Sequence, residues 1–96
     1  MEKQPCVYML SNGKNGTLYI GVTSDILQRI WQHKNEVVPG FTERYHVHDL
    51  VWYEFHTTME SAIWREKNLK DWNRVWKKRL IQKMNPEWRD LYQDLV

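Results

Sequence analysis

Residues 6–22 read CVYMLSNGKNGTLYIGV, and the architecture of the chain can be worked out from this stretch. Two apolar or aromatic runs, 7–10 and 18–22, flank a segment over 11–16 that is rich in asparagine and glycine, which favour turns. The pattern predicts a β-hairpin. Because alternate residues of a strand point to opposite faces, the hairpin also divides its side chains into two sets.

The two faces of this hairpin carry different side chains. If the hairpin is symmetric about Gly13 and Lys14, Tyr8 pairs with Tyr19, so that two phenols lie side by side on one face. The other face takes an apolar set that suits packing under a helix: Val7, Met9, Leu18, Ile20 and Val22. We therefore expect the tyrosine face to be accessible, with Gly21 leaving room for a phosphate to approach the backbone. Spacing alone favours the other interpretation, in which the two tyrosines only stabilise the hairpin.

The rest of the chain mixes helical and extended patterns. After the hairpin the sequence predicts a helix from the cap residues 23–25 to about residue 34, a loop over 36–48 and a strand over 50–55. It then predicts a helix that opens with a capping box from Thr57 to Glu60 and is broken near 71–74. A last helix is predicted from 85–87 to the C-terminus. The order predicts an α+β fold. Most of the six tryptophans are expected in the core.

The size and composition of the chain limit the possible classes of protein. Its 96 residues, of which 42% are hydrophobic, suit one domain over residues 1–96 without a second core. Cys6 is the single cysteine, and the N-terminus lacks the apolar run of a secretory signal. No run approaches the roughly 20 apolar residues that span a bilayer. We therefore expect a cytoplasmic protein that does not interact with a membrane.

Positive charge is concentrated in one part of the chain, although the net charge is only +2. Residues 65–83 hold eight lysines and arginines against two acidic residues. This segment is a candidate phosphate-binding surface. The residues expected to contact a substrate are Gly21, Lys67, Lys70, Arg74, Lys77 and Lys78. A solvated helix face without a partner is the alternative, and charge alone does not decide between the two.

Arg29 and His33 lie one turn apart on the predicted first helix, beside rather than within the apolar stripe of Ile26 and Ile30. From that position both could overlook the tyrosine face. Arginine offers a fixed fork of donors for phosphate oxygens, and histidine can carry protons near neutral pH. Two solvent-exposed side chains on the flank of a helix are the alternative.

Glu66 falls in the middle of an apolar stripe on the predicted second helix. The stripe comprises Met59, Ala62, Ile63 and Leu69. A buried carboxylate is costly unless it is paired or bound to a metal, so Glu66 needs a partner. Two interpretations stay open: a structural ion pair to Arg29 or Lys70, and a site for a divalent metal held by oxygen ligands.

These residues, taken together, resemble a known family. The triplet Cys6-Val7-Tyr8, ten residues, and then Tyr19-Ile20-Gly21 are similar to the two-part signature of the GIY-YIG nuclease superfamily. The second triplet matches in full, whereas Cys6 and Val7 replace the usual Gly-Ile of the first. Arg29 follows at the family's usual distance, and Glu66 resembles its metal-binding helix glutamate.

The resemblance covers nearly the whole chain and implies a fold and an activity. The implied fold is a small three-stranded antiparallel sheet flanked by helices, with the catalytic groups on a concave sheet surface. The implied activity is that of an endonuclease that hydrolyses phosphodiester bonds in nucleic acid, with DNA as the expected partner and Mg²⁺ or Mn²⁺ as the metal. Over residues 62–70 and 84–92 the chain looks most similar to small stand-alone bacterial proteins that resemble the nuclease domain of excinuclease C.

The resemblance also implies roles for individual residues. Tyr8 is the expected base, although a phenol with a pKa of about 10 needs Arg29 or a metal to lower that pKa. Tyr19 positions water or phosphate, Arg29 stabilises the transition-state charge, and His33 assists proton transfer. Exchanged roles for the two tyrosines and the histidine stay open. Asn85 matches a late asparagine that lines the site, but capping of the last helix explains this residue as well.

Two other functions remain open from the sequence. The first is a non-catalytic module of the same fold that binds nucleic acid through its basic segment, with an affinity that falls as salt rises. The second is a protein-interaction domain whose exposed aromatic side chains form the contact surface. A chain of 96 residues leaves little room beyond a nuclease core, so we expect target choice to depend on a protein partner, oligomerisation or DNA structure. The choice between DNA and RNA and the oligomeric state stay open.

Overall fold

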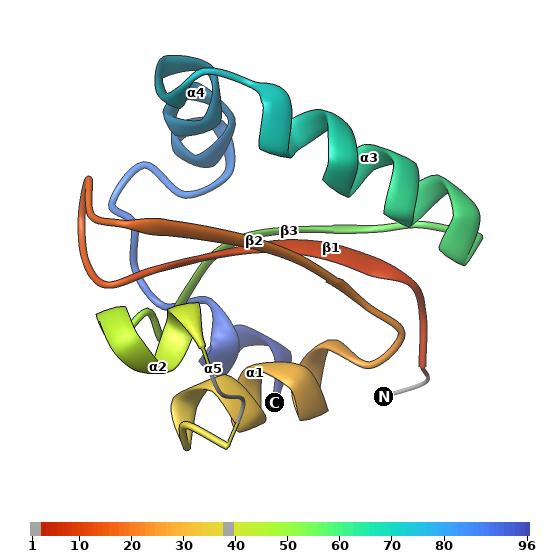
Figure 1. Cartoon of the computed structure of the whole chain (residues 1–96), viewed down its shortest axis with the longest axis horizontal. Helices are drawn as coiled ribbons and strands as arrows, with labels where there is room; N and C mark the ends of the chain where they lie inside the picture. Colours follow the sequence, from red (N-terminus) through yellow and green to blue (C-terminus); the bar gives the residue numbers. More distant parts are fainter. Residues whose placement is uncertain (1–2, 38–39) are drawn as a thin grey trace.

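The structure of the protein, a computed structural model, describes residues 3–37 and 40–96. In this part of the chain three strands form one antiparallel sheet in the order β2-β1-β3 (Figure 1). The central strand is β1 (Cys6–Ser11), with β2 (Leu18–Thr23) on one side and β3 (Asp49–Phe55) on the other. The predicted α+β class and the predicted three-stranded antiparallel sheet are confirmed.

Helices cover both faces of this sheet. On one face lie α3 (Met59–Asp71) and α4 (Arg74–Met84), and on the other lie α1 (Ile26–Lys34), α2 (Phe41–Tyr45) and α5 (Tyr92–Leu95) (Figure 1). Across residues 3–37 and 40–96, no helix combines the length and the apolar character that crossing a bilayer requires. The sheet is therefore a middle layer between two groups of helices.

The register between β1 and β2 differs from the prediction. Tyr8 pairs with Gly21, so the predicted pairing of Tyr8 with Tyr19 is wrong. The connection is longer than a two-residue turn because the side-chain oxygen of Asn12 accepts a hydrogen bond from the backbone N–H of Thr17 at 3.0 Å and closes a wider loop. Side chains alternate with a period of two, and the partner of Tyr8 has moved by two residues. Both tyrosines therefore still lie on one face.

Each face of the sheet has its own core. The core under α3 and α4 contains Val7, Met9, Ile20, Val51, Trp52, Ala62, Leu69, Ile81 and Trp88, with Leu18 and Val22 at its margin. This confirms that the apolar face of the hairpin packs under helices. The core under α1 contains Cys6, Tyr8, Leu10, Ile26, Ile30, Val47, Leu50 and Leu91. The tyrosine face was expected to be accessible, and that expectation is wrong for Tyr8, which is 1% exposed beneath α1.

Side-chain caps set the ends of the two helices on the first face. The N-cap of α3 is Thr58 rather than Thr57, because the Thr58 hydroxyl accepts a hydrogen bond from the N–H of Ser61 at 3.1 Å. The predicted capping box from Thr57 to Glu60 is therefore wrong by one residue. The predicted break near 71–74 is confirmed, since α3 ends at Asp71 and Asn73 caps α4.

The segment 36–48 is not the continuous loop that the sequence predicts. It contains α2, whose first turn is closed by a hydrogen bond from the N–H of Arg44 to the carbonyl of Gly40 at 3.0 Å. A helix of five residues is too short for a period of 3.6 to be visible in the sequence. Residues 38–39 of the predicted loop lie outside the described residues.

Asn85 ends α4 instead of starting a helix, which corrects the prediction for residues 85–87. Its buried amide donates a hydrogen bond to the carbonyl of Val51 at 3.1 Å. Further along, the N–H of Leu91 donates to the carbonyl of Leu50 at 2.7 Å, and the carboxylate of Asp90 accepts from the N–H of Leu50 at 3.1 Å. The chain after α4 therefore runs along the outer edge of β3.

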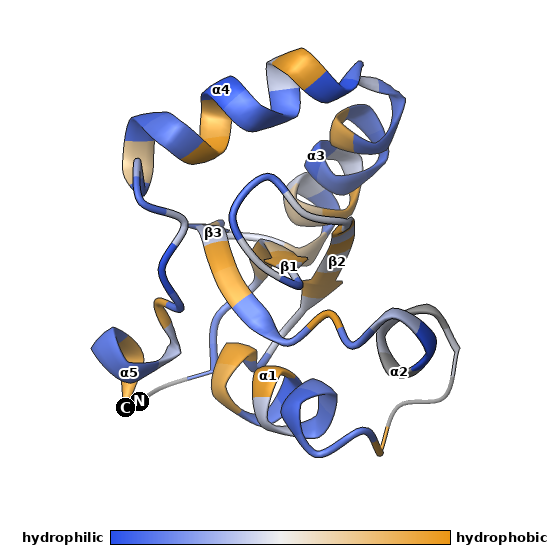
Figure 2. Ribbon diagram, turned by 90° about the vertical axis from the view of Figure 1, so that its left-hand side faces the viewer, coloured by the Kyte–Doolittle hydropathy of each residue, from blue (hydrophilic) through white to orange (hydrophobic). Residues whose placement is uncertain are grey.

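The tryptophans divide equally between the interior and the surface. Trp52 and Trp88 are buried, and Trp72 packs at the margin of a core. The exposed fractions of the other three are 53% for Trp31, 69% for Trp64 and 51% for Trp76. The expectation that most tryptophans lie in the core is therefore wrong. In Figure 2 the strands are coloured mainly hydrophobic, whereas much of α4, which carries Trp76, is hydrophilic.

Candidate functional site

Tyr8 lies at the centre of the candidate site because β1 is the middle strand and Gly21 on β2 leaves space for the Tyr8 ring. A Cβ at Gly21 would collide with the ring and the hydroxyl of Tyr8. The open space that we predicted for an approaching phosphate is therefore filled by the tyrosine itself. Gly21 permits a bulky ring to lie flat across its own backbone, which any larger residue would prevent.

His33 connects the Tyr8 hydroxyl to the segment before β3. Its Nε2 lies 3.0 Å from the Tyr8 hydroxyl, and its Nδ1 lies 2.9 Å from the hydroxyl of Thr42 on α2. His33 is 1% exposed, so it belongs to the buried face of α1 and not, as predicted, to the flank beside Ile26 and Ile30. The three side chains form one buried chain of polar contacts, Tyr8–His33–Thr42.

Burial fixes the charge of this histidine. Loss of solvent, together with the smaller effects of the positive charges of Arg29 and His48, lowers the pKa of His33 to about 4. The imidazole is therefore neutral at pH 7, with one nitrogen that donates a hydrogen bond and one that accepts. When Nδ1 donates to Thr42, Nε2 is the acceptor that faces the Tyr8 hydroxyl.

Burial also raises the pKa of Tyr8, so its hydroxyl is protonated at neutral pH. The neighbouring Tyr19 and the negative charge of Glu66 raise this pKa as well, whereas the positive charge of Arg29 lowers it. Arg29 does act in the direction that we predicted, but its influence is smaller than that of burial. A base role for Tyr8 therefore requires a group that takes its proton, and His33 is in contact with it.

Tyr19 links the buried ring cluster to the surface at the edge strand β2. Its ring centroid lies 6.3 Å from that of Tyr8 and 5.4 Å from that of His33. Tyr19 also lines a surface hollow of about 260 Å³ between β2 and the helices α3 and α4. The hollow is lined by Leu18, Tyr19, Ile20, Lys70 and Lys77. Tyr19 is thus the residue that lies both at the buried ring cluster and at this edge of the sheet.

Arg29 lies at the opposite end of the site, on the half-buried part of α1. It lines a second hollow of about 300 Å³, which is polar, together with Lys3, Thr23, Ser24, Asp25, Gln28 and Gln32. The helix is held in place by its N-cap, since the carboxylate of Asp25 accepts a hydrogen bond from the N–H of Gln28 at 3.2 Å. Arg29 therefore has contact with a surface hollow while its charge still influences Tyr8 and His33.

Glu66 lies on α3, at the rim of the core rather than in its middle. Its side chain is 14% exposed, and the flanking Met59 and Ile63 are each 37% exposed, so the predicted buried stripe is open at this point. Of the two predicted ion-pair partners, Lys70 is present, with its Nζ 3.2 Å from a carboxylate oxygen of Glu66. The Lys70 side chain is 53% exposed, and an ion pair with one exposed partner contributes little to stability. The carboxylate therefore remains suited to a divalent metal that also binds a substrate phosphate.

The predicted substrate-contacting lysines and arginine lie in different places. Lys70 and Lys77 line the same hollow as Tyr19, so the structure brings these two close to the candidate site. Arg74 instead donates to the carbonyls of Asn15 and Gly16 at 2.8 and 2.6 Å, and so attaches the start of α4 to the hairpin loop. The remaining two are Lys67, which is exposed on α3, and Lys78, which is half-buried on α4.

Asn85 lies next to β3, the strand on the far side of β1 from Tyr19. Its amide donates to the carbonyl of Arg89 at 2.8 Å, and its oxygen accepts from the N–H of the same residue at 3.2 Å. These bonds, with the one to Val51, occupy both ends of the side chain in structural contacts. A role in lining the site stays a prediction.

Sequence reasoning missed Thr42, although this residue fixes the orientation of His33. Its segment shows no periodicity, and a threonine nine residues after a histidine carries no recognisable signal. The contact exists because α2 folds back over the end of α1, which only the three-dimensional structure reveals.

Comparison with known proteins places these observations in context. A family model described as the GIY-YIG catalytic domain matches residues 4–80, a range that contains Tyr8, Tyr19, Arg29 and Glu66 but ends before Asn85. The solution NMR structure of the UPF0213 protein BH0048 from Bacillus halodurans is 28% identical, with a TM-score of 0.52 over 82% of this chain and 83% of that one. No curated protein sequence matches this one significantly.

Proposed function

The chain belongs to the GIY-YIG family, and from this premise we propose that it is a metal-dependent endonuclease that hydrolyses phosphodiester bonds in nucleic acid, with DNA as the substrate. The observation that carries the proposal is the set of groups around the Tyr8 hydroxyl. His33 contacts this hydroxyl, and the charges of Arg29 and Glu66 both act on it. A tyrosine with a purely structural role requires one hydrogen-bond partner and gains nothing from a guanidinium and a carboxylate nearby.

The route of the proton follows from the protonation states of the two buried groups. The attacking water gives a proton to the oxygen of Tyr8 while Tyr8 passes its own proton to Nε2 of His33. The phenol then remains neutral throughout, which avoids a phenolate in a buried position. The hydroxide forms a bond to phosphorus, the bond from phosphorus to the leaving oxygen breaks, and that oxygen takes a proton from solvent.

Arg29 and Tyr19 act on the substrate in this proposal. The guanidinium of Arg29 donates to the phosphoryl oxygens and stabilises the charge that develops on them. Tyr19 positions the water or the phosphate from the rim of the hollow at the edge of β2. Base function is assigned to Tyr8 rather than Tyr19 because the Tyr8 hydroxyl contacts His33.

Glu66 holds the divalent metal, Mg²⁺ or Mn²⁺. The fit rests on a partly exposed carboxylate whose lysine partner is more than half exposed and can move aside. A divalent metal held by Glu66 would supply positive charge close to the phosphate and the leaving oxygen. The flexible amine of Lys70 then becomes available to a neighbouring phosphate of the same strand.

The basic segment binds the sugar-phosphate backbone on either side of the scissile bond. Lys70 and Lys77 border the hollow that Tyr19 lines, so they contact the nearest phosphates. Lys67, Lys78 and Arg74 extend the positive surface along α3 and α4, and each neutralised phosphate releases bound counterions. Binding through this surface is expected to weaken as salt rises.

Cleavage of labelled single-stranded, duplex and branched DNA and of RNA, with Mg²⁺ or Mn²⁺ against EDTA, tests the proposal. Tyr8→Phe, Arg29→Ala and Glu66→Ala should each lower the cleavage rate by at least about 100-fold, because each removes a group that acts in the transition state. Arg44→Ala and Glu60→Ala, which change exposed residues of the same types, should cleave like the wild type. Equal cleavage by wild type and all three site variants would show that the site is elsewhere.

A non-catalytic nucleic-acid-binding module is the second candidate, and the burial of Tyr8 favours it, since a 1% exposed hydroxyl is difficult for a water molecule to reach. This candidate predicts salt-dependent binding without cleavage in any metal. The cleavage assay separates the endonuclease from the binding module, because binding can be measured in EDTA, where metal-dependent cleavage does not occur. A protein-interaction role predicts instead that Arg29→Ala and Glu66→Ala have no effect on function.

Several finer assignments belong to the same proposal. They are a relationship to the nuclease domain of excinuclease C, a bacterial source, a cytoplasmic setting, and a protein partner that selects the target. The similar structure from Bacillus halodurans supports the bacterial assignment, because it shares 28% of its residues with this chain over most of both lengths. Strand preference and oligomeric state are the properties that the cleavage assay and a measurement of molecular mass would establish.

A further inference from the structure

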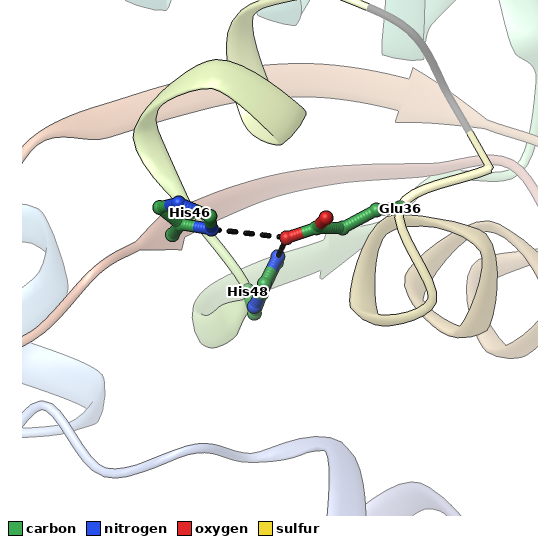
Figure 3. Close-up of side chains that lie close together, drawn as sticks. All are labelled: Glu36, His46 and His48. Carbon is green, nitrogen blue, oxygen red and sulfur yellow. Dashed lines mark hydrogen bonds and ion pairs between the residues drawn. The ribbon is translucent and has the colours of Figure 1, made fainter.

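Three possible metal ligands meet in the segment between α1 and β3, away from Glu66. Glu36 follows the end of α1, and His46 and His48 follow α2 (Figure 3). One carboxylate oxygen of Glu36 lies 3.0 Å from Nδ1 of His46 and 3.2 Å from Nε2 of His48. All three ligand atoms lie within 4.8 Å of one another. The cluster therefore brings two imidazole nitrogens and one carboxylate oxygen close together.

Hydrogen bonding accounts for only part of this arrangement. Nδ1 of His46 contacts Glu36 with acceptable hydrogen-bond geometry. Nε2 of His48 is buried and forms no hydrogen bond within the described residues, although the same Glu36 oxygen is 3.2 Å away. A buried imidazole nitrogen without a partner is costly, and a cation between the three atoms would satisfy it.

Two of the three distances are close to those between ligands of one zinc ion. Zinc binds histidine nitrogen and carboxylate oxygen at about 2.0–2.2 Å, so two ligands of a tetrahedral site lie about 3.3–3.5 Å apart. The two measured separations, 3.0 and 3.2 Å, need to widen only slightly. Two histidines and one carboxylate match a transition metal of the zinc class, whereas Mg²⁺ prefers oxygen ligands alone.

We propose that Glu36, His46 and His48 form a binding site for one zinc-class ion, separate from the metal site proposed at Glu66. The ion joins the end of α1 to the two residues after α2, and so closes the segment that contains α2. Thr42 lies within this segment and contacts His33. The ion therefore stabilises the position of the residue that orients His33, and the fourth ligand position is left to water.

His56 provides a matched control, because it too contacts a glutamate. Its Nε2 lies 2.7 Å from Glu54, and its Nδ1 lies 2.9 Å from the hydroxyl of Ser61, so both nitrogens have partners from the protein. It represents an ordinary pair of histidine and glutamate. A difference between His48 and His56 in metal binding would therefore reflect the geometry of the cluster and not the presence of a histidine beside a carboxylate.

Calorimetric titration of metal-free protein without a histidine tag with Zn²⁺, and absorption spectroscopy with Co²⁺, test the proposal. The wild type should bind one ion per chain. His46→Ala and His48→Ala should each lower the affinity by at least about 100-fold, whereas His56→Ala should bind like the wild type. Glu36→Gln, which preserves the shape of the side chain, should also bind Zn²⁺ weakly. Because this variant is expected to stay folded, its weak binding would not be caused by unfolding, and circular dichroism would detect any unfolding.

Metal binding and nuclease activity are distinguishable in this design. Glu66→Ala should bind Zn²⁺ as the wild type does, and Mg²⁺ should not displace the ion. The proposal is overturned if the wild type binds no Zn²⁺, or if His46→Ala and His48→Ala bind it as tightly as His56→Ala does. Neither result would depend on whether the protein cleaves nucleic acid.

Discussion

The two faces of the sheet use the same three strands for different purposes. Beneath α3 and α4 the buried side chains are almost all apolar, and their contribution depends on area and fit. Beneath α1 and α2 the core also includes the hydroxyls of Tyr8 and Thr42 and the imidazole of His33, which must satisfy one another. The comparison teaches that the stability of the apolar face depends on packing alone, whereas the stability of the face with polar groups in its core also depends on protonation.

Leu69→Ala should have the largest effect on stability and should sharpen the contrast. Leu69 is fully buried on the apolar face, so the substitution leaves a cavity and should lower the free energy of unfolding by about 2–5 kcal/mol. Denaturant unfolding measures this loss. Cleavage at a temperature where the variant is folded should be close to that of the wild type. A large loss of activity in the folded variant would mean that packing beneath α3 positions Glu66, which lies on the same helix.

Acid should destabilise the polar face selectively. The pKa of His33 is lowered from about 6.5 to about 4 in the folded protein, so the unfolded chain binds the extra proton first as the pH falls. The stability is fully present above pH 6.5 and should fall by about 3 kcal/mol towards pH 4. Unfolding measured from pH 7 to pH 4 for wild type and His33→Gln checks this, since the variant should lack the part of the slope that belongs to His33. Identical slopes would contradict it.

Gly21→Ala should disturb the polar face through packing alone. The added methyl group collides with the Tyr8 ring, which should cost about 1–3 kcal/mol of stability and displace the hydroxyl from His33. The same substitution in a Tyr8→Ala background should cost less, because the ring is gone. Equal costs in the two backgrounds, measured as a double-mutant cycle, would show that the collision is relieved in another way.

Lys70→Ala should have the smallest effect on stability, under about 1 kcal/mol, because the lysine of its ion pair with Glu66 is more than half exposed. The substitution should instead weaken binding to nucleic acid. Removing one phosphate contact should lower the slope of log affinity against log salt by about one. Lys14→Ala, which changes an exposed lysine outside the basic segment, is the control. A stability loss larger than that of Gly21→Ala would assign Lys70 a structural role.

The sequence is a good guide to which face a residue occupies and a poor one to what covers that face. The predicted pairing of Tyr8 with Tyr19 is wrong, yet both lie on one face because a shift of two residues preserves the alternation. The cover over Tyr8 could not be predicted, since it depends on how α1 returns across the sheet. The sequence therefore predicts a solvent-accessible Tyr8, whereas Tyr8 is almost fully buried.

The parts of the candidate site that could be predicted are those that local patterns mark. Tyr8, Tyr19, Arg29 and Glu66 stand at spacings that the family resemblance marks. Arg29 and Glu66 both influence the pKa of Tyr8, whose ring centroid lies 6.3 Å from that of Tyr19. Thr42 could not be predicted, because its importance arises from a contact across a short helix without visible periodicity. Asn85 shows the opposite error, since asparagine before proline fits a helix start and a helix end equally well.

The hydrogen bonds between β3 and the segment after α4 also determine how copies of this chain can meet. An uncovered edge strand presents unpaired N–H and C=O groups that can pair with another molecule. Here Leu50 exchanges both of its backbone bonds with Asp90 and Leu91, so the β3 edge is closed where these residues lie. The opposite edge, β2, is the one beside Tyr19 and the lysine-lined hollow. The two edges of the sheet therefore differ, because the β3 edge is covered where Asp90 and Leu91 lie and the β2 edge borders the hollow.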